Sequence, residues 1–346
     1  MRCFSIALAL TALTAVAPAA QQTVNVDFES GTLGWVGPFG STGSSGITPS
    51  GGNGGGAGYR VDFSDFVITV RNSSNPAFQG DFSIFDTVTL STDLKVDQVD
   101  FFFSPVSRPW LIELRDYDLA QGGYPWTSVW YKFADVSVAT HGSWNTFSVT
   151  IDDPSSTSLP AGWRGYGAED PSTFEPILPA GVTFADVIAG VDEIVYTTGE
   201  PGFFFGQSDF DLTLDNIRVS TTGGPWSDLG SGLAGANGEP KLFGTGTLEV
   251  GSQATLGLIG AAPGATAFLA VGSQRVDLPF FGGTLVPNGD VTIITNQVDA
   301  NGTAPFGLLW PGGLASGTDL YWQYWVLDPT GPAGLSASNG LQSTTP

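Results

Sequence analysis

The clearest pattern in the sequence is a strict alternation of apolar and polar residues over positions 209–220. Phe210, Leu212 and Leu214 share one face, and acidic or polar side chains occupy the positions between them. Because successive side chains of a strand point to opposite faces of its sheet, this period of two predicts a strand with one buried face. The turn-forming run TTGGPW follows directly, so the strand is expected to close a first domain.

Short strands separated by turn-forming residues are also predicted upstream of this one. Helical periodicity is nearly absent, and the best short helix covers residues 183–190. The Gly- and Ser-rich run 39–58 predicts a flexible loop. Together these patterns predict an all-β fold, with an N-terminal jelly-roll β-sandwich over residues 21–222. The predicted strands are residues 23–28, 58–63, 66–71, 83–90, 97–104, 110–116, 128–138, 144–151, 192–198 and 210–220.

A different pattern follows the turn at Gly223, Gly224 and Pro225. Residues 223–240 are predicted to be a linker or an entry arm, and residues 241–346 a seven-strand immunoglobulin-like β-sandwich. In its YWQYWV run at 321–326, alternate residues must face opposite ways. One set is therefore expected in the core, and the other exposed or covering a neighbouring segment.

The N-terminus has the features of a secretory signal peptide at residues 1–20. A basic residue precedes an apolar run, and small residues surround Pro18. The run is shorter than the roughly 20 apolar residues that span a bilayer. Cys3 would leave with this peptide, so the mature chain has no disulfide or thiol chemistry. These features predict a secreted, extracellular protein without membrane insertion.

Charge narrows the choice of partners. The formal net charge is −22, and removal of Arg2 with the signal peptide makes it −23. Such a field repels nucleic acid phosphates and anionic lipids, which favour basic surfaces. It is compatible with neutral ligands and with cations. No nucleic acid partner is expected, and the sequence does not determine the oligomeric state.

Two short motifs give the first domain a family resemblance. FESGTLGW at 28–35 opens the domain, and Asp215, Asn216 and Ile217 lie in its last predicted strand. These ends resemble the galactose-binding-like jelly rolls of carbohydrate-binding modules and of laminin IV (laminin B) type domains. The C-terminal sandwich resembles accessory modules of secreted bacterial proteins, which implies no chemistry of its own.

The resemblance also implies a structural calcium ion. In the resembling modules, oxygen ligands come from the first corner, from an acidic residue near the second strand, and from the aspartate of the last strand. Calcium takes 6–8 oxygen ligands, from carboxylates and carbonyls among others. The corresponding positions here are Glu29, the Gly31 carbonyl, Asp62 and Asp215. The alternative is that Glu29 and Asp215 cap turns.

Catalytic motifs are missing, and no catalytic residue is predicted. A single histidine, His141, leaves little room for a Ser-His-Asp triad or a histidine metal site, and no nucleophile-elbow, zinc-protease or phosphate-loop motif occurs. Paired carboxylates are the one enzymatic alternative, and Glu113 and Glu193 on predicted strands are the candidates. A glycosidase or a polysaccharide lyase therefore stays open as a third possibility.

Aromatic residues supply the binding hypothesis. Sugar rings pack on aromatic faces while nearby polar groups bind their hydroxyls, and two loops rich in Gly and Pro combine both kinds of side chain. We predict a non-catalytic protein that binds a neutral glycan weakly at a cell surface or in an extracellular matrix. The alternative is a structural or adhesive protein without a small-ligand site. The predicted ligand residues are Tyr117, Tyr124, Trp126, Trp163, Arg164 and Tyr166.

Overall fold

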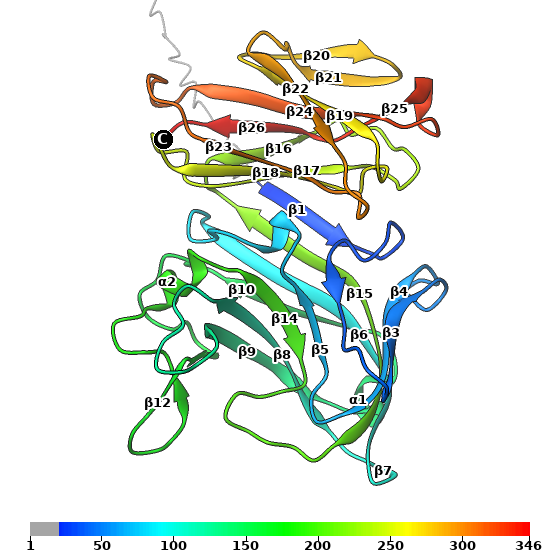
Figure 1. Ribbon diagram of the computed structural model, residues 1–346, viewed down its shortest axis with the longest axis vertical. Coiled ribbons are helices and arrows are strands. Elements are labelled where there is room, and N and C mark those ends of the chain that lie inside the picture. The colour runs from blue at the N-terminus through cyan, green and yellow to red at the C-terminus, as the bar shows by residue number, and fades with distance from the viewer. Residues whose placement is uncertain (1–20) are drawn as a thin grey trace, which may run out of the picture.

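The computed structural model describes residues 21–346, so the predicted signal peptide lies outside the described residues. Two β-sandwiches follow one another along the chain, and Figure 1 shows the second stacked on one end of the first. The predicted all-β fold is confirmed, since helices are confined to a few short turns. No helix among the described residues is long and apolar enough to cross a membrane. The helical segments are α1 (Val138–His141), α2 (Phe184–Ile188), η1 (Pro76–Phe78) and η2 (Pro332–Gly334).

The first sandwich consists of two facing sheets, which we call sheet A and sheet B. In order, sheet A contains β10 (Asn145–Ile151), β6 (Thr87–Phe101), β15 (Ser208–Thr222), β4 (Gly58–Asp65) and β3 (Gly43–Thr48), with β1 (Gln21–Val26) on β15 and β7 (Ser104–Pro105) on β6. Sheet B contains β11 (Trp163–Tyr166), β9 (Thr127–Val136), β8 (Arg108–Asp116), β14 (Glu193–Thr197), β5 (Thr69–Asn72) and β2 (Trp35–Val36). A small hairpin of β12 (Ala168–Glu169) and β13 (Pro176–Ile177) follows β11.

Strand β15 runs through the middle of sheet A and carries the alternation seen in the sequence. Phe210, Leu212 and Leu214 are buried in the core between the sheets. The strand pairs with β4 as far as Leu214, and from Ile217 onward with β1. A bulge at Asp215 and Asn216 separates the two halves, and Asn216 has a φ of 48°. The expected neighbourhood of the first and last strands is therefore confirmed.

Three predictions for the first domain are wrong. Predicted strands 83–90 and 97–104 are replaced by one continuous strand, β6, flanked by the short β7. The glycine-rich run 39–58 contains a strand, β3, held to β4 by backbone pairing. The loop around Arg164 includes strand β11. The predicted helix is confirmed as α2, where Thr183 and Asp186 form a capping box.

The second sandwich holds sheets that we call C and D, and β20 (Arg275–Phe280) with β21 (Gly283–Pro287) forms a separate hairpin. Sheet C contains β16 (Trp226–Gly230), β26 (Gly340–Thr344), β24 (Asp319–Leu327), β19 (Thr266–Gly272) and β22 (Thr292–Gln297), with β25 (Leu335–Ala337) on β24. Sheet D contains β17 (Lys241–Thr245), β18 (Gln253–Ile259) and β23 (Ala304–Leu309). Residues 241–346 thus form ten strands and not the predicted seven, and immunoglobulin-like topology stays a prediction.

The segment 223–240 is not a plain linker. It includes β16, which pairs with β26, and the Trp226 side chain is fully buried in the second core. In β24, Trp322 and Tyr324 point into that core, whereas Gln323 and Trp325 are covered by the β20–β21 hairpin. The outward set of the YWQYWV run therefore covers a neighbour, one of the two predicted outcomes.

The two sandwiches share an interface. The Gln22 side chain exchanges two hydrogen bonds with the backbone of Gly244, at 2.8 and 3.0 Å. Phe243 of β17 packs on Phe85, and both belong to the core of the first sandwich, as does Ile259. The second sandwich therefore completes the core of the first.

Candidate functional site

The outer face of sheet B carries buried charged side chains. In β8, Ile112 and Leu114 point into the core, so Glu113 and Arg115 point outward. Nevertheless Glu113 is only 3% exposed and Arg115 9%. Ionised side chains are seldom buried unless they are paired. Other side chains must therefore cover them and satisfy their charges.

Arg115 is the centre of this arrangement. Its guanidinium donates to Glu113 Oε2 at 2.6 and 2.9 Å and to Glu193 Oε2 at 2.9 Å. Strand β14 positions Glu193 directly across from Arg115 in the sheet register. Burial alone would lower the pKa of Arg115, but the charges and hydrogen bonds of the two carboxylates outweigh it and raise the pKa. On the far side of Glu193, Arg71 lies 3.5 Å from Oε1.

Four aromatic rings cover this polar centre. Trp126 Nε1 donates to Glu113 Oε1 at 2.9 Å, and the Arg115 guanidinium lies 3.8 Å from the centroid of the Trp126 ring. The Tyr117 hydroxyl donates to Glu193 at 2.8 Å. Tyr166 packs against both Trp126 and Tyr124, with centroid distances of 6.0 and 5.2 Å. The result is a partly exposed aromatic surface with fixed ring orientations, which we call the aromatic site.

The structure therefore brings together four of the six predicted ligand residues, Tyr117, Tyr124, Trp126 and Tyr166. Trp163 is a correction: it is 5% exposed and packs in the core against Tyr131 and Phe184. The reason is strand alternation in β11, which turns Trp163 inward and its neighbours Arg164 and Tyr166 outward. Arg164 lies two residues from Tyr166 on the same outer face.

The paired-carboxylate alternative finds no free acid here. Glu113 Oε1 accepts hydrogen bonds from Trp126 and Ser128, and its Oε2 accepts both from Arg115. Glu193 Oε2 accepts from Arg115 and Tyr117. A glycosidase needs one carboxyl to donate a proton and another to act on the sugar from across a cleft. Glu113 and Glu193 instead hold one arginine between them.

Of the predicted calcium ligands, the structure separates Asp62 from the corner that holds Glu29 and Asp215. Asp62 lies opposite Asp211 on β4 and pairs with Arg60 at 3.0 Å, which places it four register positions from Asp215. Glu29 accepts a hydrogen bond from Ala57 N at 2.6 Å, and Asp215 accepts one from Asn53 N at 2.7 Å. Both carboxylates therefore hold opposite ends of the same glycine-rich turn. The described residues contain no group of three His, Cys, Asp or Glu arranged to hold a metal ion.

Asp93 is a buried neighbour of Asp215 that the sequence did not identify. The amides of Asn53 and Asn216 each donate to Asp93 at 2.9 Å, and Thr146 donates at 2.6 Å. Burial raises the pKa of Asp215 to about 6, and the charges of Asp93 and Asp27 add to the effect. A cation at this corner would stabilise the ionised form of Asp215.

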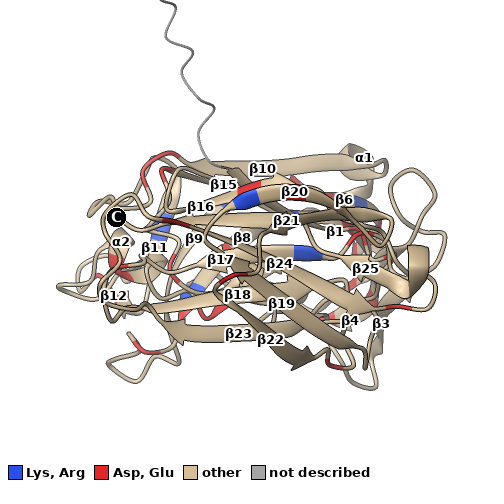
Figure 2. Cartoon of the chain, turned by 90° about the horizontal axis from the view of Figure 1, so that it is seen from above, with Lys and Arg blue, Asp and Glu red and all other residues tan. Residues whose placement is uncertain are grey.

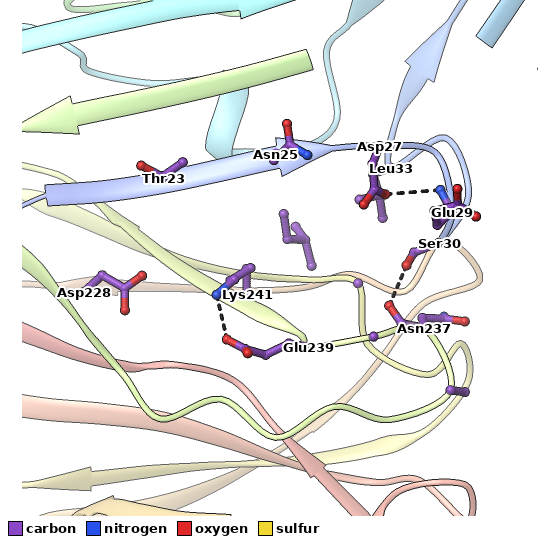
Figure 3. A pocket seen from close by; sticks show the side chains of 14 residues that line it. Thr23, Asn25, Asp27, Glu29, Ser30, Leu33, Asp228, Asn237, Glu239 and Lys241 are labelled. Atoms are coloured by element: carbon purple, nitrogen blue, oxygen red, sulfur yellow. Dashed lines mark hydrogen bonds and ion pairs between the residues drawn. The ribbon is translucent and has the colours of Figure 1, made fainter. Parts of the chain in front are cut away.

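A cavity of ≈ 680 Å³ lies between the two sandwiches (Figure 3). Ser30 closes one end of it by donating to the Asn237 carbonyl at 2.5 Å, and Lys241 pairs with Glu239 at 2.6 Å. Its lining includes further acidic groups, Asp27, Glu29 and Asp228, but no aromatic residue. It therefore lacks the flat apolar surfaces that bind sugar rings, and the aromatic site remains the better candidate.

Part of the aromatic site had a signal in the sequence. Glu113 and Arg115 share a face of the predicted strand 110–116, and Tyr117 follows its last residue. The sequence does not identify Glu193 as the second carboxylate partner of Arg115, because only the sheet topology places its strand, β14, beside β8.

No protein-family model matches this chain, and no curated protein matches it. Among solved structures, the family 30 carbohydrate-binding module of the cellulosomal cellulase Cel9D-Cel44B of Clostridium thermocellum is 11% identical, with a TM-score of 0.28; the match covers 59% of this chain and 92% of that module. The N-terminal CBM22-1–CBM22-2 tandem domain of Xyn10C from Paenibacillus barcinonensis is 14% identical, with a TM-score of 0.34, over 96% of this chain and 92% of that one.

An exo-β-agarase is also 14% identical, with a TM-score of 0.34, over 56% of this chain. The match covers 24% of the agarase, so this chain spans about a quarter of its length. At these scores the similarity carries no argument about function, which has to come from the residues of the site.

Proposed function

We propose that this protein is exported and binds a neutral glycan, without catalysis, through the aromatic site on sheet B. The observation that supports this is the set of rings held in place over a charged centre. Tyr117 is 40% exposed, and Tyr124, Trp126 and Tyr166 are partly exposed around it. Rings fixed by hydrogen bonds and by a cation–π contact lose little entropy when a ligand binds.

The expected affinity is modest. Each ring contact contributes about 0.5–1.5 kcal/mol, by analogy with aromatic pairs. After the costs of association, two or three rings give a Kd of about 10⁻³–10⁻⁵ M. The matrix or cell-surface location of the glycan is part of the proposal.

Tyr124→Ala is the first test. Tyr124 packs on Tyr166 at the edge of the site, so its loss is expected to weaken binding of a neutral oligosaccharide about two- to tenfold, in line with one ring contact of about 0.5–1.5 kcal/mol. The melting temperature is expected to stay within about 2 °C, since a substitution at a partly exposed surface position changes the unfolding free energy little. Calorimetric titration of a panel of neutral oligosaccharides measures the affinity.

Phe103→Ala is the matched control, because this ring is almost fully exposed and belongs to the turn between β6 and β7. It is expected to bind as the unmodified protein does. If Tyr124→Ala also binds unchanged, the glycan face lies elsewhere. Trp126→Ala is a poorer test, since it also removes a hydrogen bond to Glu113 and the stacking of Arg115.

An adhesive role is the second candidate. Exposed phenylalanines gather at the far end of the first sandwich, away from the second one: Phe66 packs on Phe204, and Phe102 and Phe103 project from the β6–β7 turn. Large exposed apolar patches often mark interaction surfaces. A double variant Phe102→Ser, Phe103→Ser that loses adhesion while keeping glycan binding would favour this candidate.

We also propose that calcium stabilises the corner that holds Glu29 and Asp215. With an extracellular-type Kd of ~10⁻⁴ M, calcium at about 1 mM contributes ~1.4 kcal/mol. This raises the melting temperature by roughly 2–4 °C. Calorimetry with calcium and with chelator tests it, and Asp215→Asn is expected to remove the difference. Identical melting of the unmodified protein in both conditions would count against the ion.

The same variant tests the pKa of Asp215. Because burial raises this pKa from 3.8 to about 6, the folded protein binds the proton more tightly than the unfolded chain does. Without calcium, the unfolding free energy contributed by this group is expected to fall as pH rises from about 4 to about 6. Denaturant titrations over this pH range should show a smaller fall in the unfolding free energy of Asp215→Asn than in that of the unmodified protein. An equal fall in both proteins would assign the pH dependence to other groups.

A further inference from the structure

A cleft of ≈ 500 Å³ opens at the edge of sheet B, beside the aromatic site. It is lined by Trp130 of β9 and Arg164 of β11, and by two loops, the β12–β13 turn and the segment after β14. An adjacent cavity of ≈ 570 Å³ shares Trp130, Arg164 and Glu200 with it. Because Arg164 and Tyr166 are two residues apart on one face of β11, a ligand on the aromatic site can extend into this cleft.

Two phenylalanine rings from the two loops line the cleft and are left in solvent. Phe174 is 73% exposed and Phe203 is 68% exposed. Phe174 also has a φ of 59°, a left-handed conformation that glycine adopts freely and a bulky residue rarely does. Exposed rings and a strained backbone both cost free energy, and such features concentrate at binding sites.

Arg164 supplies an available positive charge. It is exposed and forms no ion pair within residues 21–346, whereas nearby Lys132 is already paired with Asp135 and Glu200. The Arg164 guanidinium lies 5.4 Å from the centroid of the Trp130 ring. Trp130 is 2% exposed, and its Nε1 is a buried donor without a partner in this structure. An acceptor group entering the cleft would find the exposed Arg164 guanidinium without an ion pair among the described residues.

The cleft carries charges of both signs: Arg164 is basic, whereas Glu175 and Glu200 are acidic, and Glu200 is paired with Lys132. The chain has 33 acidic and 11 basic residues, and Figure 2 shows how sparse the basic ones are. Four of them, Arg71, Arg115, Lys132 and Arg164, nevertheless stand on the outer face of sheet B. Arg71, Arg115 and Lys132 are paired with carboxylates, so among the described residues of this face Arg164 supplies the positive charge that an anionic group would meet.

We propose that this cleft binds an anionic sugar residue that follows the neutral stretch of glycan on the aromatic site. Its carboxylate or ester sulfate accepts hydrogen bonds from Arg164, and its ring packs against Phe174 and Phe203. A uronate carboxylate and a sulfate present the same oxygen acceptors to a guanidinium, which binds such groups in a fork. The inference rests on the proposed function, because the cleft extends the aromatic site and adds a charged residue to the recognised chain.

The test uses the full mature chain and three hexasaccharides of matched length: a neutral β-1,4-glucan, an oligomannuronate and a sulfated galactan. Calorimetric titration at low ionic strength is expected to give about tenfold tighter binding of at least one acidic hexasaccharide than of the neutral one. Arg164→Gln is expected to abolish this preference. Arg218→Gln is the matched control, because Arg218 is also exposed and without an ion pair but belongs to sheet A.

Phe174→Gly gives a second readout. Glycine accepts the positive φ, so the melting temperature is expected to stay or rise, while binding of the preferred acidic hexasaccharide weakens about threefold or more. Equal affinity for all three hexasaccharides, or an equal effect of Arg164→Gln and Arg218→Gln, would overturn the anionic subsite. Whether the neutral hexasaccharide binds decides the proposed function separately, and a difference between mannuronate and sulfated galactan identifies the anionic group.

Discussion

Replacing Phe243 with alanine is expected to destabilise the first sandwich, although Phe243 belongs to a strand of the second. Its ring is 1% exposed and lies in the first core against Phe85. Truncation of a buried phenylalanine costs about 3–5 kcal/mol, because apolar surface is lost from the core and a cavity remains. At roughly 2–4 °C per kcal/mol, the melting temperature should fall by about 10 °C.

The same interface predicts that the two sandwiches unfold together. Gln22 binds the backbone of Gly244 from the first strand of the chain, and Ile84 packs against both cores. Calorimetry is expected to show one transition for the unmodified protein. Phe281→Ala is the control, since this ring is 53% exposed on the hairpin farthest from the interface, and it should change stability by less than about 0.5 kcal/mol. Two separate transitions, with the first insensitive to Phe243→Ala, would refute the shared core.

An element can be predicted from the sequence when local residues stabilise it, and cannot when its stability comes from a distant partner strand. Strand β15 and helix α2 carry their own signals, an apolar alternation and a capping box, and both were predicted. Strand β3 has no such signal, because its Gly-Ser-Ser-Gly run lacks apolar side chains; backbone pairing with β4 holds it, together with the Ser45 hydroxyl, which bonds to Pro38 O and Tyr59. Its partner, and not its composition, makes it a strand.

Strand β16 shows the same limit over a longer distance. Its sequence WSDLG follows a turn and precedes a glycine-rich segment, so the sequence predicts a linker or an entry arm there. Its partner is β26, at the opposite end of the second sandwich in sequence. Pairing between strands far apart in sequence forms only in the folded sheet, so no local sequence pattern predicts it.

The sequence predicts the strand residues of the candidate site only where the alternation of apolar and polar residues is clear. In β8 the outward positions could be identified from the sequence, but their burial could not, since the rings that cover them come from a loop and from β11. In β11 the strand itself was missed. Neighbouring residues of a strand point to opposite faces of its sheet. Trp163 is therefore buried, whereas Arg164 and Tyr166 do not point into the core.

Replacing Arg115 with leucine is expected to have the second large effect. The substitution leaves Glu113 and Glu193 buried side by side with their shared partner removed. Breaking a buried ion pair by removing one partner costs about 3–5 kcal/mol, because an uncompensated charge remains.

A triple variant, Arg115→Leu with Glu113→Gln and Glu193→Gln, separates charge from packing. Removing all three charges is expected to recover part of the stability that Arg115→Leu loses, because the desolvation of the carboxylates is avoided. Glycan binding should stay weak in both variants, since Trp126 loses the guanidinium that stacks on it at 3.8 Å. Urea titrations of the two variants measure the first effect, and calorimetric titration measures the second. If Arg115→Leu costs less than about 1 kcal/mol, the network behaves as a solvated surface ion pair. The rings would then have to owe their fixed positions to packing alone.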